Sequence, residues 1–473
     1  MGSDFPFLGR FEAGQLEMAA TGVDVEQPGM VAAGDGVGQP EMAASGYSHG
    51  DASFVQTCLN GLNALSGGWV SLALLAAVAG VCWYTGILLK RCMSADPTVR
   101  TFADIGDRAF GRRGRVIVAG FFHAELFLIA IGFLIVDGDN LDKLFPGVHV
   151  SVGHVTLAGK KLFVVLVALA VTPTTWLRSL GLLAYVSATG VFASVLIVLS
   201  VLWAAAVDGV GFSAPGATAV RPVTKLPTAL GLFTFCLCGH AVFPTLYTSM
   251  KEKRRFPKML AICFVLCTIN YGSMAVLGYL MYGAGVQSQV TLNLPAGRVS
   301  SKIAIVTTIV SPLSKYALVV TPIATAIEER ILRRGGAGGR SGAAAVMPIE
   351  TAVEEGILRD GAAGSGVATP IPRNLRGGFA VSVAVRTLLV LSTVVVALAV
   401  PYFGYLMALV GSLLSVGACV MLPCVCYLRV FRPPARAAET VVIVAILVLS
   451  SVLLVTGTYS SIVQIVHELR ARH

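Results

Sequence analysis

Long apolar segments recur along the chain, separated by polar loops of unequal length. They run over 69–89, 116–136, 162–177, 180–207, 228–250, 258–282, 303–327, 379–400, 402–430 and 441–466. A helix needs roughly 20 mostly apolar residues to cross a bilayer core. Pro173 does not argue against a helix at 162–177, because neighbouring helices satisfy freed backbone groups in membranes. The pattern predicts an all-α, polytopic helical membrane protein with ten clear spans.

Composition supports the same class of protein. Hydrophobic residues make up 55% of the chain and charged residues only 13%. An ordinary soluble domain carries about twice that share of charge. The composition therefore excludes a soluble globular protein and makes the lipid bilayer the principal environment of the chain.

The loops alternate between rich and poor in lysine and arginine. One set, which includes 90–115, 251–258 and 328–378, holds 23 basic residues, and the opposite set holds nine. Cytosolic loops carry the excess of basic residues, so the first set is predicted to be cytosolic. The net charge of +10 then reflects membrane topology and attraction to anionic lipids, not nucleic-acid binding.

The N-terminus conflicts with this topology. The loop charges place Gly68 on the side opposite the cytosol, here called the far side. Residues 1–52 carry eight acidic residues and one basic residue, without a signal-peptide pattern. Residues 53–68 are too short and too polar to supply another crossing. Either the tail is translocated, or an early helix is missing or broken.

Two segments are predicted to lie outside the membrane core. Residues 1–52 form an acidic tail of degenerate twelve-residue repeats with few large apolar residues, which predicts disorder. Residues 331–376 form a cytosolic low-complexity loop, in which PIATAIEERILRRGGAGG (322–339) reappears as PIETAVEEGILRDGAAGS (348–365). Loops accept such insertions at small cost. The membrane domain is therefore assigned to 53–473.

Four strongly ionisable or titratable side chains lie well within the predicted spans: Glu125, His240, Lys315 and Arg386. Charges at that depth cost several kcal/mol and usually face a polar path or a partner. Glu125, the one carboxyl inside a predicted span, is a candidate proton carrier or the partner of Lys315 in an ion pair. His240 suits proton exchange near neutral pH or a packing role. Arg386 is expected to extend its guanidinium toward the cytosolic surface.

The cysteines do not indicate a metal centre. Cys236 and Cys238 are separated by one residue within an apolar segment, as are Cys424 and Cys426. That setting is typical of small side chains used for packing. No cofactor or metal is predicted, and the absence of a nucleophile–base pair argues against an enzyme.

The segment around His240 contains two residues that interrupt helices. It reads FTFCLCGHAVFPTLYTSMK, with Gly239 and Pro244 near its middle. Secondary transporters bind small zwitterions at such interruptions, where half-helix ends meet the carboxylate and the ammonium group. A purely structural kink is the alternative. With the prolines of SPLSKYALVVTP (311–322), the interruption favours a polar pathway.

Several strings resemble the plant vacuolar amino-acid transporters of the amino acid/auxin permease family. They include SFVQTCLNGLNALSG, GILLKRCMSADP, TFADIGDRAFGRRGR, FLIVDGDNLDKLFPG, FPTLYTSMK, QVTLNLP and SKYALVVTPI, and they cover nearly all of 53–466 in order. The resemblance implies an inverted-repeat fold of eleven helices. It also implies amino acids and protons as the transported species, at the vacuolar membrane.

The chain departs from this family at its first helix. Gly67 runs directly into Gly68 and Trp69, where the family has about fifteen further residues, most of a span. The missing stretch agrees with the crossing that the loop charges require. The resemblance implies substrate contacts at Asn63, Gly67, His240 and Pro244, and the interrupted segment adds Cys238 and Gly239. The titratable side chains within the spans make Glu125, His240 and Lys315 the candidates for proton coupling.

These observations predict a secondary active transporter that moves amino acids in a proton-coupled manner. The alternative is a non-transporting paralogue or a membrane interaction protein, because the substrate motif of the first helix is absent.

Overall fold

The computed structural model describes residues 69–96, 98–152, 155–176, 183–212, 226–287, 289–335, 373–400, 402–431 and 437–470. The predicted acidic tail, Asn63 and Gly67 lie outside the described residues, and so does most of the predicted loop at 331–376. The predicted disorder, the predicted loop and the shortened first helix therefore stay predictions.

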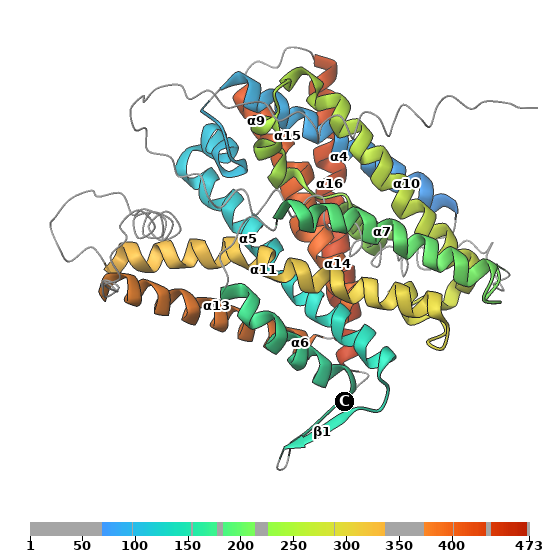
Figure 1. Ribbon diagram of the computed structural model, residues 1–473. Coiled ribbons are helices and arrows are strands. Elements are labelled where there is room, and N and C mark those ends of the chain that lie inside the picture. The colour runs from blue at the N-terminus through green and yellow to red at the C-terminus, as the bar shows by residue number, and fades with distance from the viewer. Residues whose placement is uncertain are drawn as a thin grey trace, which may run out of the picture. The chain divides into compact units, whose positions relative to one another are not determined.

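The described chain is helical apart from one hairpin (Figure 1). Its long helices are α4 (Trp69–Ala95), α5 (Phe102–Leu144), α6 (Gly159–Trp176), α7 (Leu183–Ala206), α10 (Phe256–Tyr282), α11 (Val299–Gly335), α13 (Arg373–Ala399) and α16 (Ala437–Arg470). Its shorter elements are α8 (Leu226–Cys236), the 3₁₀ turns η3 (His240–Val242), η4 (Lys253–Arg255), η5 (Gly283–Gly285) and η6 (Val290–Leu292), α9 (Phe243–Ser249), α14 (Phe403–Leu409), the π-helix η8 (Val410–Met421), α15 (Leu422–Val430), and the strands β1 (His149–Val152) and β2 (Val155–Ala158).

Eight described helical segments are long and apolar enough to cross a membrane, and two shorter apolar helices cover 192–206 and 226–242. Each of the ten predicted segments overlaps one of them. Large apolar side chains such as Val441, Leu449 and Tyr459 of α16 are exposed. A continuous apolar exterior of this kind suits contact with lipid.

Helix α5 is longer than the sequence predicts. It begins at a capping box between Thr101 and Asp104, in which each side chain accepts the other residue's backbone N–H. Gly111 then turns the chain with φ 64°, a conformation that favours glycine. The helix continues beyond the predicted end at 136 to Leu144, which adds a further buried acid, Asp137. The interpretation of Glu125 as the one carboxyl inside a span is therefore wrong.

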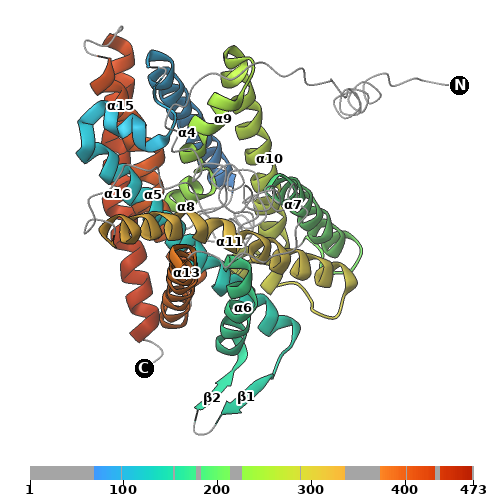
Figure 2. The same cartoon turned by 60° about the vertical axis from the view of Figure 1, so that its left-hand side comes forward.

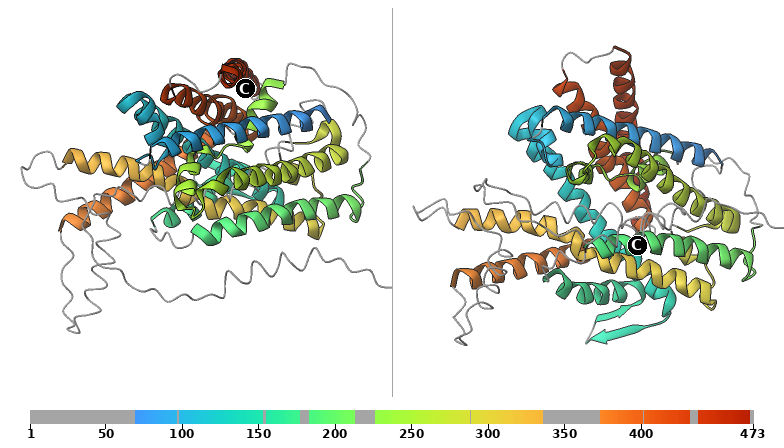
Figure 3. Two further views of the ribbon diagram at one scale, coloured as in Figure 1. Left: turned by 90° about the horizontal axis from the view of Figure 1, so that it is seen from above. Right: turned by 45° about the horizontal axis from the view of Figure 1, so that its top comes forward.

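The helices pack in two groups that share α5. The α11 group consists of α6, α7, α11 and α13, with α11 in contact with each of the other three. The η8 group consists of α4, α8, η8, α15 and α16, with η8 in contact with all of the others. Helix α5 contacts members of both groups (Figures 1 and 2). Helix α10 lies between α4 and α7 and so joins the groups on another side (Figure 3).

A two-stranded antiparallel hairpin follows α5 on the predicted far side (Figure 2). Strands β1 and β2 pair with His149 opposite Ala158 and Val152 opposite Val155. The apolar segments gave no signal for this hairpin, because its strands are only four residues each.

Candidate functional site

The predicted interruption between Gly239 and Pro244 is confirmed. Helix α8 ends at Cys236, and α9 begins at Phe243 with Pro244 in its first turn. Proline is compatible with that position because the N–H groups of a first turn have no partner within the helix. The intervening residues form only the short 3₁₀ turn η3, so the α-helical hydrogen bonds stop between Cys236 and Phe243.

His240 opens η3 and is fully buried. Its Nε2 atom lies 2.9 Å from Thr85 Oγ1 and 3.0 Å from the carbonyl oxygen of Cys82, both on α4. A carbonyl oxygen can only accept, and Thr85 donates its own hydroxyl proton to that same carbonyl. Nε2 therefore carries the proton, and Nδ1 is the basic nitrogen.

Nδ1 of His240 is buried without a hydrogen-bond partner among the described residues. The Cys419 thiol of η8 lies beside Cys238 and the imidazole. The ring of Phe243 packs on the other side, with ring centroids 4.7 Å apart. A basic nitrogen in these surroundings is available to a proton or to the N–H group of a ligand.

Glu125 is buried on α5 and contacts η8. Ser415 donates a hydrogen bond from Oγ to Glu125 Oε1 over 2.6 Å. Ser415 belongs to a twelve-residue π-helical stretch, and π-helical turns are frequent at functional sites. One element, η8, therefore contacts two of the three predicted proton-coupling residues, His240 through Cys419 and Glu125 through Ser415.

Lys315 is buried on α11, one helical turn after Ser311. Its Nζ donates to Ser311 Oγ over 2.9 Å. Both Lys315 and Glu125 have further interactions, and an ion pair between these two residues stays a prediction.

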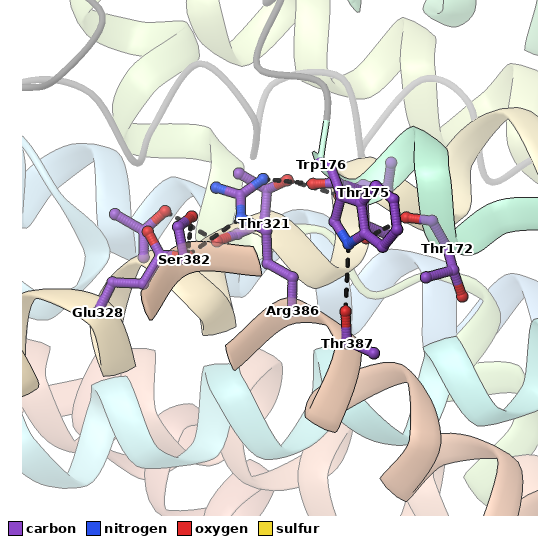
Figure 4. A network of polar contacts seen from close by, with 10 residues as sticks. Thr172, Thr175, Trp176, Thr321, Glu328, Ser382, Arg386 and Thr387 are labelled. Carbon is purple, nitrogen blue, oxygen red and sulfur yellow. Dashed lines mark hydrogen bonds and ion pairs between the residues drawn. The ribbon is translucent and has the colours of Figure 1, made fainter. Parts of the chain in front are cut away.

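Arg386 does not extend to the surface, so the expectation from sequence is wrong. Its side chain is 6% exposed and its Nε lies 3.0 Å from Glu328 Oε1. Its Nη1 donates to the carbonyl oxygen of Thr175 over 2.6 Å, and Ser382 donates to the same Glu328 oxygen over 2.7 Å (Figure 4). The partly buried carboxylate of Glu328 on α11 and the carbonyl oxygen of Thr175 on α6 hold the guanidinium within the α11 group.

Helices α8, η8 and α16 approach one another closely next to the interrupted segment. A Cβ atom on Gly411 of η8 would lie 1.8 Å from the carbonyl oxygen of Gly231 on α8. A Cβ atom on Gly457 of α16 would lie 2.7 Å from the Cβ of Ser412. Small residues at such crossings let helix backbones approach closely in membranes.

The structure adds residues that sequence reasoning missed. Thr85, Cys82, Ser415 and Cys419 lie in apolar segments and carry no charge, so nothing marked them among similar small residues. The one available signal was the run VGSLLSVGACVM in η8, which is rich in small residues. Cys236, Cys424 and Cys426 are buried free thiols, and no group of three metal-binding side chains occurs within the described part of the chain.

Comparison with known proteins shows that the chain is similar to amino acid transporters. The family described as transmembrane amino acid transporter protein matches residues 64–463. Amino acid transporter AVT1J of Arabidopsis thaliana is 43% identical over 427 residues, which cover 87% of this chain and 91% of that protein. Amino acid transporter AVT1I of the same plant is 41% identical over 431 residues, covering 88% and 96%. A solved Na⁺-coupled sialic acid symporter shares the fold, with a TM-score of 0.50 at 13% identity over 89% of this chain and 88% of its own.

Proposed function

Because this chain belongs to the transmembrane amino acid transporter family, we propose that it moves amino acids across the vacuolar membrane, coupled to the proton gradient. Family membership makes it an amino acid transporter and an integral membrane protein, not an enzyme. The proton coupling and the vacuolar location are the parts that we propose.

The observation that carries the proposal is the interruption between α8 and α9. It leaves Nδ1 of His240 buried and without a hydrogen-bond partner among the described residues. Interrupted membrane helices are the usual place for a transporter to bind polar groups, because their backbone is irregular only where it faces a cavity or protein. We assign the substrate contact to Cys238, Gly239, His240 and Pro244.

The charges at this site suit the ammonium group of an amino acid. The carbonyl end of α8 at Cys236 carries the partial negative charge of a helix C-terminus. Nδ1 of His240 accepts a hydrogen bond in the tautomer that Thr85 and Cys82 impose. Both features favour a hydrogen-bond donor with positive charge over an anion.

Glu125 and His240 are proposed to exchange the coupled proton, with Lys315 close to the same pathway. Both acid–base groups are buried and contact η8. A change of charge on either group therefore alters its interaction with the same π-helical element. That shared contact supports a mechanism in which protonation and the conformation of η8 change together.

The vacuolar membrane is supported by the motifs that resemble plant vacuolar transporters, such as FLIVDGDNLDKLFPG and SKYALVVTPI. The loop charges place the predicted far side opposite the cytosol, and in a vacuole this side is the acidic lumen. Localisation of the tagged full chain in plant cells tests this assignment, and labelling confined to the plasma membrane would refute it.

Uptake into proteoliposomes tests transport and coupling separately. The full chain is reconstituted and given a labelled neutral amino acid, with and without an imposed pH gradient. We expect exchange of labelled for unlabelled amino acid without a gradient, and accumulation with one that a protonophore abolishes. Exchange without any effect of the gradient would refute the coupling, and absence of both would refute transport by this chain.

A second candidate follows from the shortened first segment at 53–68. If a substrate motif has been lost there, the chain is a non-transporting paralogue or an interaction partner of intact transporters. Insertion of a full-length first helix separates the two possibilities in the same assay. Uptake that appears only after the insertion supports the non-transporting protein.

A further inference from the structure

A buried carboxylic acid near the far-side end of α5 has no part in the site described above. Asp137 is 1% exposed, and its Oδ1 atom has no hydrogen-bond partner among the described residues. It lies twelve residues after Glu125 on the same helix, about 18 Å further along the axis. A charged carboxylate without compensation is costly at such a position, so burial favours the neutral acid.

Asn140 presents an acceptor one turn further along α5. Residues three apart share a helix face, so Asn140 and Asp137 lie together. Asn140 Nδ2 donates to the carbonyl oxygen of Val136 over 2.8 Å and to Gln289 Oε1. Both amide protons are thus used, and the fully buried Oδ1 atom has no partner among the described residues.

A hydrogen-bond chain of fixed direction holds Asn140 in this orientation. Gln289 accepts from Asn140 and donates from Nε2 to Asp139 Oδ2 over 3.3 Å. Asp139 Oδ1 lies 3.4 Å from Lys160 Nζ, whose side chain is 34% exposed. This series of hydrogen bonds therefore begins at the partly exposed Lys160 on the predicted far side and ends at Asn140. It leaves Asn140 Oδ1, beside Asp137, in need of a hydrogen-bond donor.

We propose that Asp137 is a proton-binding site on the far-side half of the transporter, in which the acid donates its proton to Asn140 Oδ1. One proton then gives a hydrogen-bond partner to both Asp137 Oδ1 and Asn140 Oδ1, which otherwise have none among the described residues. Asn140 is a positioning residue, because it fixes the acceptor without binding the proton covalently. This inference rests on the proposed coupling to protons, but it does not require that Glu125 or His240 carries the proton.

The exchange step is a simple acid–base reaction. The Asp137 carboxylate takes a proton from a hydronium ion of the far-side solution, which leaves a carboxylic acid and a water molecule. Release reverses the step, with the acid O–H bond breaking and its electron pair remaining on Asp137. No oxidant, metal or other co-reactant is needed.

The charged groups around this end of α5 have other partners or face solvent. Lys143 donates to the carbonyl oxygens of Thr291 and Leu292, and Lys160 pairs with Asp139. Lys161 of α6 and Lys302 of α11 are exposed, and Asp142 is half-buried. Further along the packed helices, Lys315 donates to Ser311, and Arg386 pairs with Glu328. His240 of η3 bonds the carbonyl oxygen of Cys82. The 3₁₀ turn η6 contains no titratable side chain. None of these groups is seen to neutralise a charged Asp137.

Infrared spectroscopy of the purified full-length protein tests the protonation directly. A carboxylic acid has a C=O stretch that a carboxylate lacks, and the stretch shifts in heavy water. At neutral pH we expect this band in Glu125→Gln, in which Glu125 cannot contribute to it, and its loss when Asp137→Asn is added to that variant. Retention of the band in the double variant would overturn the proposal. If that variant fails to fold, absence of the band from Glu125→Gln would overturn it equally.

Transport by Asp137→Asn separates proton binding from a purely structural role. The asparagine keeps a neutral donor beside Asn140, so folding and amino acid exchange without a gradient are expected to persist. Gradient-driven accumulation is expected to fall by about tenfold or more, which corresponds to about 1.4 kcal/mol. Asp142→Asn, on the same helix, is the matched control and is expected to accumulate substrate like the wild type.

The outcomes distinguish this inference from the proposed function. Unchanged gradient-driven accumulation in Asp137→Asn would overturn the role of Asp137 while leaving coupling intact. A wild-type protein that exchanges amino acids without responding to a gradient would refute the coupling, and the infrared band would still decide whether Asp137 holds a proton.

Discussion

The α11 group and the η8 group both bury titratable side chains, but they treat them differently. In the α11 group, Arg386 and Glu328 form an ion pair between two uninterrupted helices, with Ser382 and the carbonyl oxygen of Thr175 as further partners. Against the η8 group, His240 of η3 stands in an interrupted segment next to a π-helix, and its Nδ1 has no partner among the described residues.

This difference separates a structural use of buried charge from a functional one. A guanidinium paired with a carboxylate on regular helices cannot readily change its partner, because removal of either charge leaves the other unpaired. A buried imidazole with one nitrogen held by α4, and the other without a hydrogen-bond partner among the described residues, is ready to bind a proton or a ligand. The contrast therefore supports a structural role for Arg386 and the roles proposed for His240 and Glu125 in transport.

Loss of Arg386 from its ion pair with Glu328 should cause the largest fall in stability. Arg386→Leu leaves Glu328 buried without its charged partner, which costs about 3–5 kcal/mol in comparable proteins. We expect a large fall in the melting temperature of the detergent-purified protein. The double variant Arg386→Leu/Glu328→Leu should recover most of that loss, because neither charge remains. A single variant as stable as the wild type would contradict the structural role.

The close crossing behind the interruption should be the next most sensitive position. Gly411→Ala places a Cβ atom 1.8 Å from the carbonyl oxygen of Gly231, and overpacking of this kind typically costs about 1–3 kcal/mol. The melting temperature measures the effect. Gly80→Ala is the matched control, because no atom lies within 4 Å of its added Cβ. Equal stability of the two variants would show that α8 and η8 are further apart.

Neutralisation of Glu125 tests the proposed functional role of a buried acid. Glu125→Gln keeps the shape that Ser415 contacts but cannot release a proton. We expect gradient-driven accumulation to fall by about tenfold, equivalent to about 1.4 kcal/mol, with the melting temperature little changed. Glu329→Gln, at an exposed position of α11, is the control. Full gradient dependence in Glu125→Gln would rule out Glu125 as the proton carrier.

Loss of the Thr85 hydroxyl beside His240 should give the smallest effect. Thr85→Val removes one of two acceptors for Nε2 of His240 and leaves the carbonyl oxygen of Cys82. Loss of one hydrogen bond of this kind costs about 1 kcal/mol, so we expect uptake to fall about fivefold. Thr85→Ser keeps the hydroxyl and should restore uptake. Identical uptake by the two variants would show that Thr85 does not orient His240.

Much of the architecture was predictable, because the bilayer imposes a simple rule on composition. Every predicted apolar segment overlaps a described apolar helix, and the interruption at Gly239 and Pro244 is where those residues suggested it. Both features depend on local chemistry, namely the cost of polar groups in lipid and the poor fit of glycine and proline within helices.

The ends and partners of the helices were less predictable. Asp137 ended the apolar run at 116–136, yet α5 continues to Leu144 and buries it. Arg386 was expected at the surface, yet Glu328 of α11 and Thr175 of α6 hold it inside. Residues from distant parts of the chain compensate for Arg386, whereas Asp137 is buried although its Oδ1 atom has no hydrogen-bond partner among the described residues.

The sequence by itself determined that this is a helical membrane protein, which segments lie in the bilayer, and where one of them is interrupted, since these depend on hydrophobicity and on backbone preferences of nearby residues. Only the tertiary structure decided which nitrogen of His240 is protonated and that η8 contacts both Glu125 and His240. It also decided that Arg386 is paired, whereas Asp137 Oδ1 has no hydrogen-bond partner among the described residues. Those properties depend on atoms that are far apart in the chain and meet only when the helices pack.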